Sequence, residues 1–233
     1  MLLKRLFSRR AAVYWAIAAM LPLLSHTHGT KAQVPPTTLS FASVADTYVD
    51  GGSATTNFNS STTLKADASP VRIIYLRFAV TGLAGRTVQQ ARLRMAVVGA
   101  SDGGSVHTVT TNLTWNEATV NYNTRPGYSS TALATLGPVA VGATAEWNLD
   151  GKITADGVYD YAIDTTNTGA VSYNSAAATS GLKPTLVLTL AAAPPTVTIS
   201  QPPEGASFFV GDTVTLQGAA TNNLGSSIAS AIA

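Results

Sequence analysis

The stretch Ile73-Ile74-Tyr75-Leu76-Arg77-Phe78-Ala79-Val80 decides the fold, because its apolar side chains recur at every second position. Successive side chains of a β-strand point to opposite faces of the sheet. We therefore predict a strand whose core-facing residues are Ile74, Leu76, Phe78 and Val80, with Ile73, Tyr75 and Arg77 on the opposite face. Such a strand buries one face and needs a second layer to cover it.

The same period-two pattern returns further along the chain. Ala91, Leu93, Met95 and Val97 alternate with Arg92 and Arg94. Further short strands are predicted around residues 45–50, 64–67, 106–110, 132–136, 145–149, 158–164, 170–173 and 185–190. Clusters of Gly, Asn, Asp and Ser separate them, at residues 50–53, 102–105 and 167–169. Many short strands at this spacing predict an all-β, antiparallel sandwich, with at most one helical turn, at residues 150–155.

The first 32 residues are typical of a secretory signal peptide. Lys4, Arg5, Arg9 and Arg10 precede an apolar stretch over residues 11–24, and small residues at positions 30 and 32 offer a cleavage site before Gln33. The apolar stretch is shorter than the roughly 20 residues that span a bilayer. We therefore expect a secreted or cell-surface protein with no stable membrane insertion after cleavage.

Charge and cysteine content exclude several function classes. Five of the 14 basic residues lie in the predicted signal and none of the 12 acidic residues does, so the remainder carries a net charge of −3. That balance argues against a nucleic-acid partner. The chain has no cysteine, which excludes disulfides, thiolate metal sites and cysteine nucleophiles. Only 11% of its residues are charged, which fits an extracellular β protein.

The remaining chain divides into two predicted folded parts. Residues 33–38 are predicted as a linker and residues 39–190 as the main module. A second linker at residues 191–195 contains Pro194-Pro195. Residues 196–233 begin with alternating strands, at residues 196–201 and 211–216, that resemble the opening of a bacterial immunoglobulin-like domain. Such a domain needs about 100 residues, so we expect an incomplete immunoglobulin-like segment.

The main module carries a series of blocks that resemble carbohydrate-binding module family 96 and the related DNRLRE and disaggregatase-repeat domains of secreted bacterial proteins. The blocks are Ala45-Asp46-Thr47-Tyr48-Val49, Asn57-Phe58, Ser60-Ser61-Thr62-Thr63-Leu64, Tyr75-Leu76-Arg77-Phe78, Ala91-Arg92-Leu93-Arg94, Trp115-Asn116-Glu117-Ala118-Thr119-Val120-Asn121-Tyr122-Asn123 and Pro126. Position 122 has Tyr where the family pattern usually has Trp, and residues 174–177 replace a frequent Arg-Glu pair. The resemblance implies a jelly-roll fold and a polysaccharide partner, with uronate-containing polymers as one substrate class.

Candidate ligand-binding residues follow from the chemistry of anionic sugars. A planar guanidinium holds a carboxylate through two parallel hydrogen bonds, so Arg77, Arg92 and Arg94, together with Tyr75, are predicted to form one basic sheet face. Tyr128 joins them because it lies in a Gly- and Ser-rich loop. The alternative is that the three arginines are exposed strand residues, with Arg77 paired to Asp46 or Glu117.

Three aspartates are candidates for a structural calcium ion. Asp46, Asp50 and Asp67 could supply oxygen ligands, of which Ca²⁺ takes six to eight. They are scattered rather than gathered in one loop, and Asp46 could instead accept hydrogen bonds from backbone donors at a strand end.

No residue pattern indicates catalysis. A glycosidase needs two carboxylates, but Glu117 lies in a block that looks structural and Glu146 has no identifiable partner. The chain also lacks a nucleophile elbow or phosphate loop. We therefore predict that the chain is not an enzyme but a monomeric, non-catalytic polysaccharide-binding module of a secreted modular protein. The alternative is a structural or adhesive spacer of a cell-surface protein.

Overall fold

The computed structural model describes residues 36–192 and 196–221. The predicted signal peptide (residues 1–32) and residues 222–233 of the predicted immunoglobulin-like segment lie outside the described residues. The two predicted linkers lie outside them in part.

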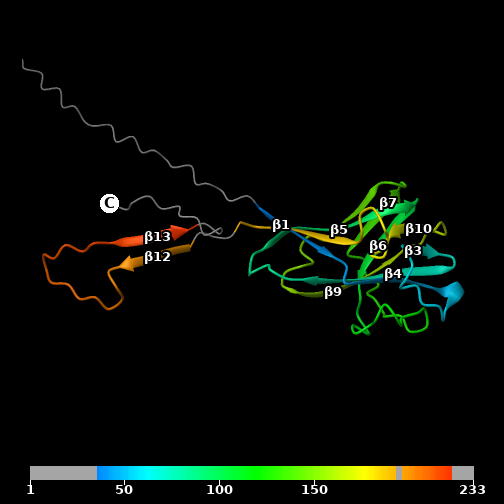
Figure 1. Cartoon of the computed structure of the whole chain (residues 1–233), viewed down its shortest axis with the longest axis horizontal. Helices are drawn as coiled ribbons and strands as arrows, with labels where there is room; N and C mark the ends of the chain where they lie inside the picture. Colours follow the sequence, from blue (N-terminus) through cyan, green and yellow to red (C-terminus); the bar gives the residue numbers. More distant parts are fainter. Residues whose placement is uncertain (1–35, 193–195, 222–233) are drawn as a thin grey trace, which may run out of the picture. The chain divides into compact units, whose positions relative to one another are not determined.

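Eleven strands form two antiparallel layers between residues 37 and 190 (Figure 1). The first layer contains β1 (Thr37–Ala42), β11 (Thr185–Leu190), β5 (Val88–Gly99) and β8 (Thr144–Asn148). The second contains β2 (Ala45–Asp50), β4 (Val71–Val80), β9 (Gly157–Asp164), β6 (Ser101–Thr108) and β7 (Ala134–Val139). The layers are joined through β10 (Val171–Asn174) and β3 (Thr63–Ala68). The predicted antiparallel β-sandwich is confirmed.

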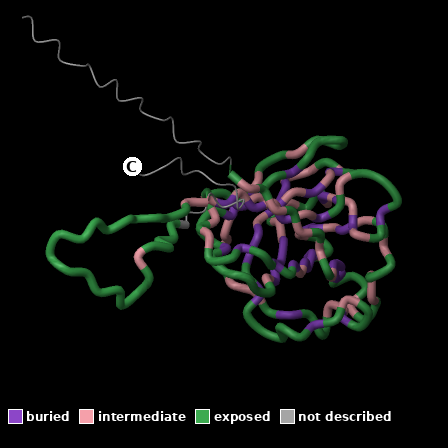
Figure 2. Tube along the Cα trace, turned by 60° about the vertical axis from the view of Figure 1, so that its left-hand side comes forward, coloured by how far each residue is buried: buried purple, intermediate pink, exposed green. Residues whose placement is uncertain are grey.

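The core lies between the two layers, where the period-two pattern predicted it. Every second residue of β4, from Ile74 to Val80, is buried there, and so is every second residue of β5, from Ala91 to Val97. Figure 2 shows buried residues gathered in the interior of this domain. Burial of apolar side chains in such a core supplies most of the free energy that stabilises a domain without disulfides.

A second apolar cluster covers the outer face of the second layer. Ile73 and Tyr75, on the face of β4 away from the main core, are 3% and 0% exposed. They pack with Val49 of β2, Ala162 of β9 and residues of the long connection between β6 and β7. This outer face is therefore covered by a connection rather than open to solvent.

Two glycines that were predicted to end a strand lie inside β6 instead. Gly103 and Gly104 approach their neighbours closely: a Cβ at 103 would lie 2.9 Å from the Leu136 side chain, and one at 104 would lie 2.5 Å from the Asp164 carbonyl oxygen. Gly104 also has a φ of +87°, which side chains rarely tolerate. These glycines permit close packing of strands rather than mark a turn.

Two further expectations are corrected. Residues 150–155 form no helical turn, and the helix among the described residues is the 3₁₀ turn Gly51–Ser53. After the sandwich, β12 (Thr196–Gln201) pairs with β13 (Gln217–Thr221), so the second strand follows residues 211–216 rather than containing them. The immunoglobulin-like character of this hairpin stays a prediction.

Candidate functional site

Residues 109–133, which we call the cover segment, connect β6 to β7 and pack over the outer face of β2, β4 and β9. Arg77 of β4 fastens this segment. Its Nε donates to Asp160 of β9 over 2.8 Å, and its terminal nitrogens donate to the carbonyl oxygens of Leu113 and Trp115. The guanidinium carbon also lies 4.8 Å from the centre of the Trp115 ring. The charge of Arg77 is therefore satisfied within the protein, and neither acidic partner considered from the sequence pairs with it.

Two predicted ligand-binding tyrosines also hold the cover segment. The Tyr75 hydroxyl donates to the carbonyl oxygen of Pro126 over 2.7 Å, and the Tyr128 hydroxyl donates to Asp164 over 2.9 Å. Burial is the main cause that raises the pKa of Tyr75 and of Tyr128 above the ordinary tyrosine value. Both phenols therefore stay protonated as donors, and their hydroxyls are occupied by internal partners.

Asn57 and Glu117 complete the attachment. The Asn57 amide donates to the carbonyl oxygens of Glu117 and Val120, each over 2.6 Å. The Glu117 carboxylate accepts the backbone N–H of Asp46 over 2.8 Å. Several blocks that carry the family resemblance, those containing Asp46, Asn57, Arg77 and Glu117, thus meet at one place, where they fix a long connection onto a sheet.

The predicted single arginine face is not formed. Arg92 and Arg94 lie on β5 in the first layer, pointing away from the core, whereas Arg77 points away from the core on the opposite layer. Arg92 pairs with Asp150 and Arg94 with Glu146 across the edge of β8. The guanidinium of Arg92 is the main cause that lowers the pKa of Asp150. Period-two alternation gives the face of a strand but not the layer to which the strand belongs.

The three candidate calcium ligands do not converge. Asp50 and Asp67 both pair with Arg72, over 2.7 and 3.1 Å, so the two carboxylates share one guanidinium. Asp46 lies four residues from Asp50 on β2, roughly 13 Å away at the rise of a strand, and accepts the backbone N–H of Ala176. Burial raises the pKa of Asp46. Within residues 36–192 and 196–221 no three His, Asp or Glu side chains are grouped to hold a metal, and these aspartates do not fit one.

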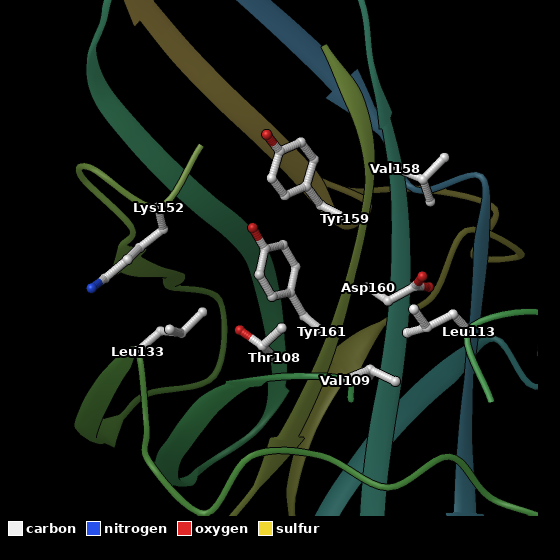
Figure 3. Close-up of a pocket in the computed structure, with 9 residues that line it drawn as sticks. All are labelled: Thr108, Val109, Leu113, Leu133, Lys152, Val158, Tyr159, Asp160 and Tyr161. Carbon is white, nitrogen blue, oxygen red and sulfur yellow. The ribbon is translucent and has the colours of Figure 1, made fainter. Parts of the chain in front are cut away.

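A cleft opens instead along the edge of β9 (Figure 3). It has a volume of about 320 Å³ and is lined by Thr108, Val109, Leu113, Leu133, Lys152, Val158, Tyr159, Asp160 and Tyr161. β9 pairs with β4 over residues 157–163 but with β6 only over residues 161–164. The edge of β9 at residues 157–160 therefore has no neighbouring strand among those described.

Aromatic side chains form one wall of this cleft. Tyr159 and Tyr161 project from the same side of β9, toward Lys152 and Leu133 (Figure 3). Tyr159 is half-buried, and its hydroxyl donates to the carbonyl oxygen of Ala155 over 2.8 Å. Flat aromatic surfaces with polar rims pack well against sugar rings and their hydroxyls, and the chemistry of the cleft therefore suits a carbohydrate.

The two charged residues that line the cleft, Lys152 and Asp160, differ in whether a partner already satisfies their charge. Lys152 is exposed and is the basic residue among those that line it, and no described carboxylate lies within ion-pairing distance of its ammonium group. Asp160 is the acidic residue in the lining, and Arg77 neutralises it. A ligand in this cleft thus meets one free cation.

The sequence contained part of this site. A strand was predicted at residues 158–164, and in any strand Tyr159 and Tyr161 share one face, but the sequence could not show that β6 stops pairing with β9 at Thr108. Lys152 lies in the stretch that was predicted to be helical, and no motif pointed to it.

A two-layer antiparallel sandwich with an aromatic cleft on an open strand edge defines a β-sandwich ligand-binding module. Residues 37–190 match the family model of carbohydrate-binding module family 96, and the chain belongs to this family. Its main domain is therefore a carbohydrate-binding module, and modules of this class are generally non-catalytic. A comparison with curated proteins found no match. Over residues 36–192 and 196–221 no helix is long and apolar enough to cross a membrane.

Proposed function

We propose that this module binds acidic, uronate-containing polysaccharide in the β9 cleft and serves as the binding part of a secreted modular protein. The observation that carries the proposal is that Tyr159, Tyr161 and Lys152 line one cleft beside the part of β9 where pairing with β6 ends. Membership of family 96 supports carbohydrate as the ligand class.

The charge of the cleft favours an acidic sugar. Because the carboxylate of Asp160 is neutralised by Arg77, the free ammonium of Lys152 dominates the local field. A uronate carboxylate would form a charge-assisted hydrogen bond with that ammonium while the ring packs on Tyr159. A neutral sugar would gain only the packing.

The N-terminal sequence supports secretion. A basic segment followed by an apolar stretch over residues 11–24 is typical of an exported protein, and the low content of charged residues fits an extracellular setting. The monomeric state and the immunoglobulin-like segment stay predictions.

Affinity electrophoresis of the purified protein in gels that contain alginate, polygalacturonate or a neutral glucan tests this function. We expect the two polyuronates to retard the protein. Replacing Lys152 with alanine should lower the affinity for polyuronates, measured from the retardation, by about tenfold. A hydrogen bond to a charged group contributes about 1.5–3 kcal/mol. The effect should shrink as salt is added, because this lysine is exposed.

Two matched controls sharpen the test. Lys183→Ala also removes one exposed lysine but lies outside the cleft, so it should bind like the wild type. Fully methyl-esterified pectin keeps the polygalacturonate backbone while masking its carboxylates, and it should retard the protein weakly. Equal retardation by the ester and the free acid would rule out recognition of the uronate carboxylate. If no polysaccharide retarded the protein, the alternative function of a structural or adhesive spacer would be favoured.

The arginines of the first layer are expected to contribute nothing to this binding. Arg92→Ala combined with Arg94→Ala should leave the retardation by alginate within about twofold of the wild type, because both side chains are on the layer opposite the cover segment and are paired with Glu146 and Asp150. A loss comparable to that of Lys152→Ala would move the binding site to the β5 face.

A further inference from the structure

Among the residues that the structure describes, the hydroxyl of one buried tyrosine has no hydrogen-bond partner. Tyr75, Tyr161 and Tyr173 are 0%, 2% and 0% exposed. The Tyr75 hydroxyl donates to the carbonyl oxygen of Pro126 and the Tyr173 hydroxyl to that of Gly103, over 2.7 and 2.6 Å. The Tyr161 hydroxyl is sealed from solvent and has no hydrogen-bond partner among the described residues. Buried polar groups are almost always satisfied, so this exception calls for a cause.

The unpartnered hydroxyl belongs to the one of the three tyrosines that lines the β9 cleft. Figure 3 shows the Tyr161 ring beside Tyr159, with both rings extending from β9 toward Lys152 and Leu133. Tyr161 is thus both part of the main core and part of the inner wall of the cleft.

We propose that the Tyr161 hydroxyl is a specificity group of the cleft, which donates a hydrogen bond to an oxygen of the sugar unit bound between Tyr159 and Lys152. This inference rests on the proposed function. It adds that Tyr161 selects for a sugar that presents a hydrogen-bond acceptor at the inner wall of the cleft. A site that leaves a polar group unpaired without its ligand discriminates strongly against analogues that lack the matching atom.

The hydroxyl is well suited to donate. Burial, with a smaller contribution from the neighbouring Tyr159, raises the pKa of Tyr161 above the ordinary tyrosine value, so the phenol is protonated at neutral pH, where a sugar carboxylate is ionised. A carboxylate or hydroxyl oxygen of the sugar can accept a hydrogen bond from it.

A ligand reaches this hydroxyl only if one wall of the cleft moves. Tyr159 is held through its hydroxyl by Ala155, and Leu133 packs against the main core. Lys152 is exposed and forms no ion pair with a described carboxylate, so its side chain is not held in place by a charged partner. The Lys152 side chain would therefore move outward as the sugar enters. Its ammonium group would then pair with the carboxylate of the sugar.

The test compares Tyr161→Phe with Tyr173→Phe in the full protein, by thermal unfolding and by affinity electrophoresis in alginate. Tyr161→Phe removes an unsatisfied group, so Tm should stay unchanged or rise while binding to alginate weakens by about five- to tenfold. Tyr173→Phe leaves the Gly103 carbonyl oxygen unpaired, so Tm should fall by about 3–5 °C with unchanged binding.

Two outcomes would overturn the inference. If Tyr161→Phe lowers Tm as much as Tyr173→Phe, the hydroxyl already has a partner, such as an enclosed water molecule. If Tyr161→Phe binds alginate like the wild type, the hydroxyl does not contact the ligand. These failures differ from failure of the proposed function, in which the wild type itself is not retarded by polyuronates. Loss of binding to a neutral glucan in Tyr161→Phe would support the inference while contradicting uronate specificity.

Discussion

Replacing Arg77 with methionine is expected to lower the free energy of unfolding by about 3–5 kcal/mol, the usual cost of removing one partner of a buried ion pair. Asp160 would keep its charge with a side chain only 7% exposed, and the carbonyl oxygens of Leu113 and Trp115 would lose their donor. Urea denaturation followed by tryptophan fluorescence measures the change. Because Leu113 and Asp160 line the β9 cleft, affinity for polyuronates should fall as well.

A matched substitution on the other layer separates this effect from the loss of any arginine. Arg92 has a similar exposed fraction, 23% against 19% for Arg77, but its partner carboxylates on Glu146 and Asp150 are 44% and 38% exposed. Arg92→Met should therefore cost no more than about 1 kcal/mol. Adding Asp160→Asn to Arg77→Met should recover part of the lost stability by removing the buried charge. If Arg77→Met and Arg92→Met lowered the free energy of unfolding equally, the role of Arg77 in holding the cover segment would be contradicted.

The sequence was sufficient for most strands and for the core-facing residues of β4 and β5, because the alternation of side chains is a local property, but it missed β1 at residues 37–42 and the first half of β6. Leu76 and Leu93 could be assigned to the core from their own neighbours alone. The layer to which each strand belongs is not local, since β4 and β5 follow each other in the chain yet lie in opposite sheets. The arginines of β4 and β5 therefore have the same alternating pattern in the sequence, but they lie on opposite layers in the structure.

The covered outer face left a signal that could have been used. Ile73 and Tyr75 are large and apolar, and they stand on the face of β4 that would be polar if it were exposed. Their character shows that something covers this face. The Trp115 block supplies the cover, but only the three-dimensional structure reveals that Asn57, Arg77 and Tyr75 hold it.

The cleft could not be predicted from the sequence, because its position depends on where strands stop pairing with each other. It exists because β6 stops pairing with β9 at Thr108, and because the chain near Lys152 and Leu133 comes to the same edge. These residues lie outside the sequence blocks that carry the family resemblance, although the family model as a whole matches residues 37–190.

Replacing Trp147 with alanine is expected to destabilise the sandwich by about 3–5 kcal/mol, the range observed for large aromatic residues truncated in a core. Trp147 lies on β8 in the first layer and is 1% exposed. Its indole N–H donates to the carbonyl oxygen of Gly104 on β6, in the second layer, over 3.0 Å. The ring also meets Tyr173 edge-on, with 5.5 Å between ring centres. One side chain thus fills the core and links the two layers, and thermal and urea unfolding measure its contribution.

Trp147→Phe divides this effect into its two parts. Phenylalanine keeps most of the apolar contact but cannot donate to Gly104, so it should cost about 1–2 kcal/mol for the lost hydrogen bond and the smaller ring. The alanine variant adds the cavity. If phenylalanine were as destabilising as alanine, the hydrogen bond between layers would outweigh the packing of the ring. If both variants unfolded like the wild type, the two layers would be held together elsewhere, and the core of this module would not depend on its largest buried side chain.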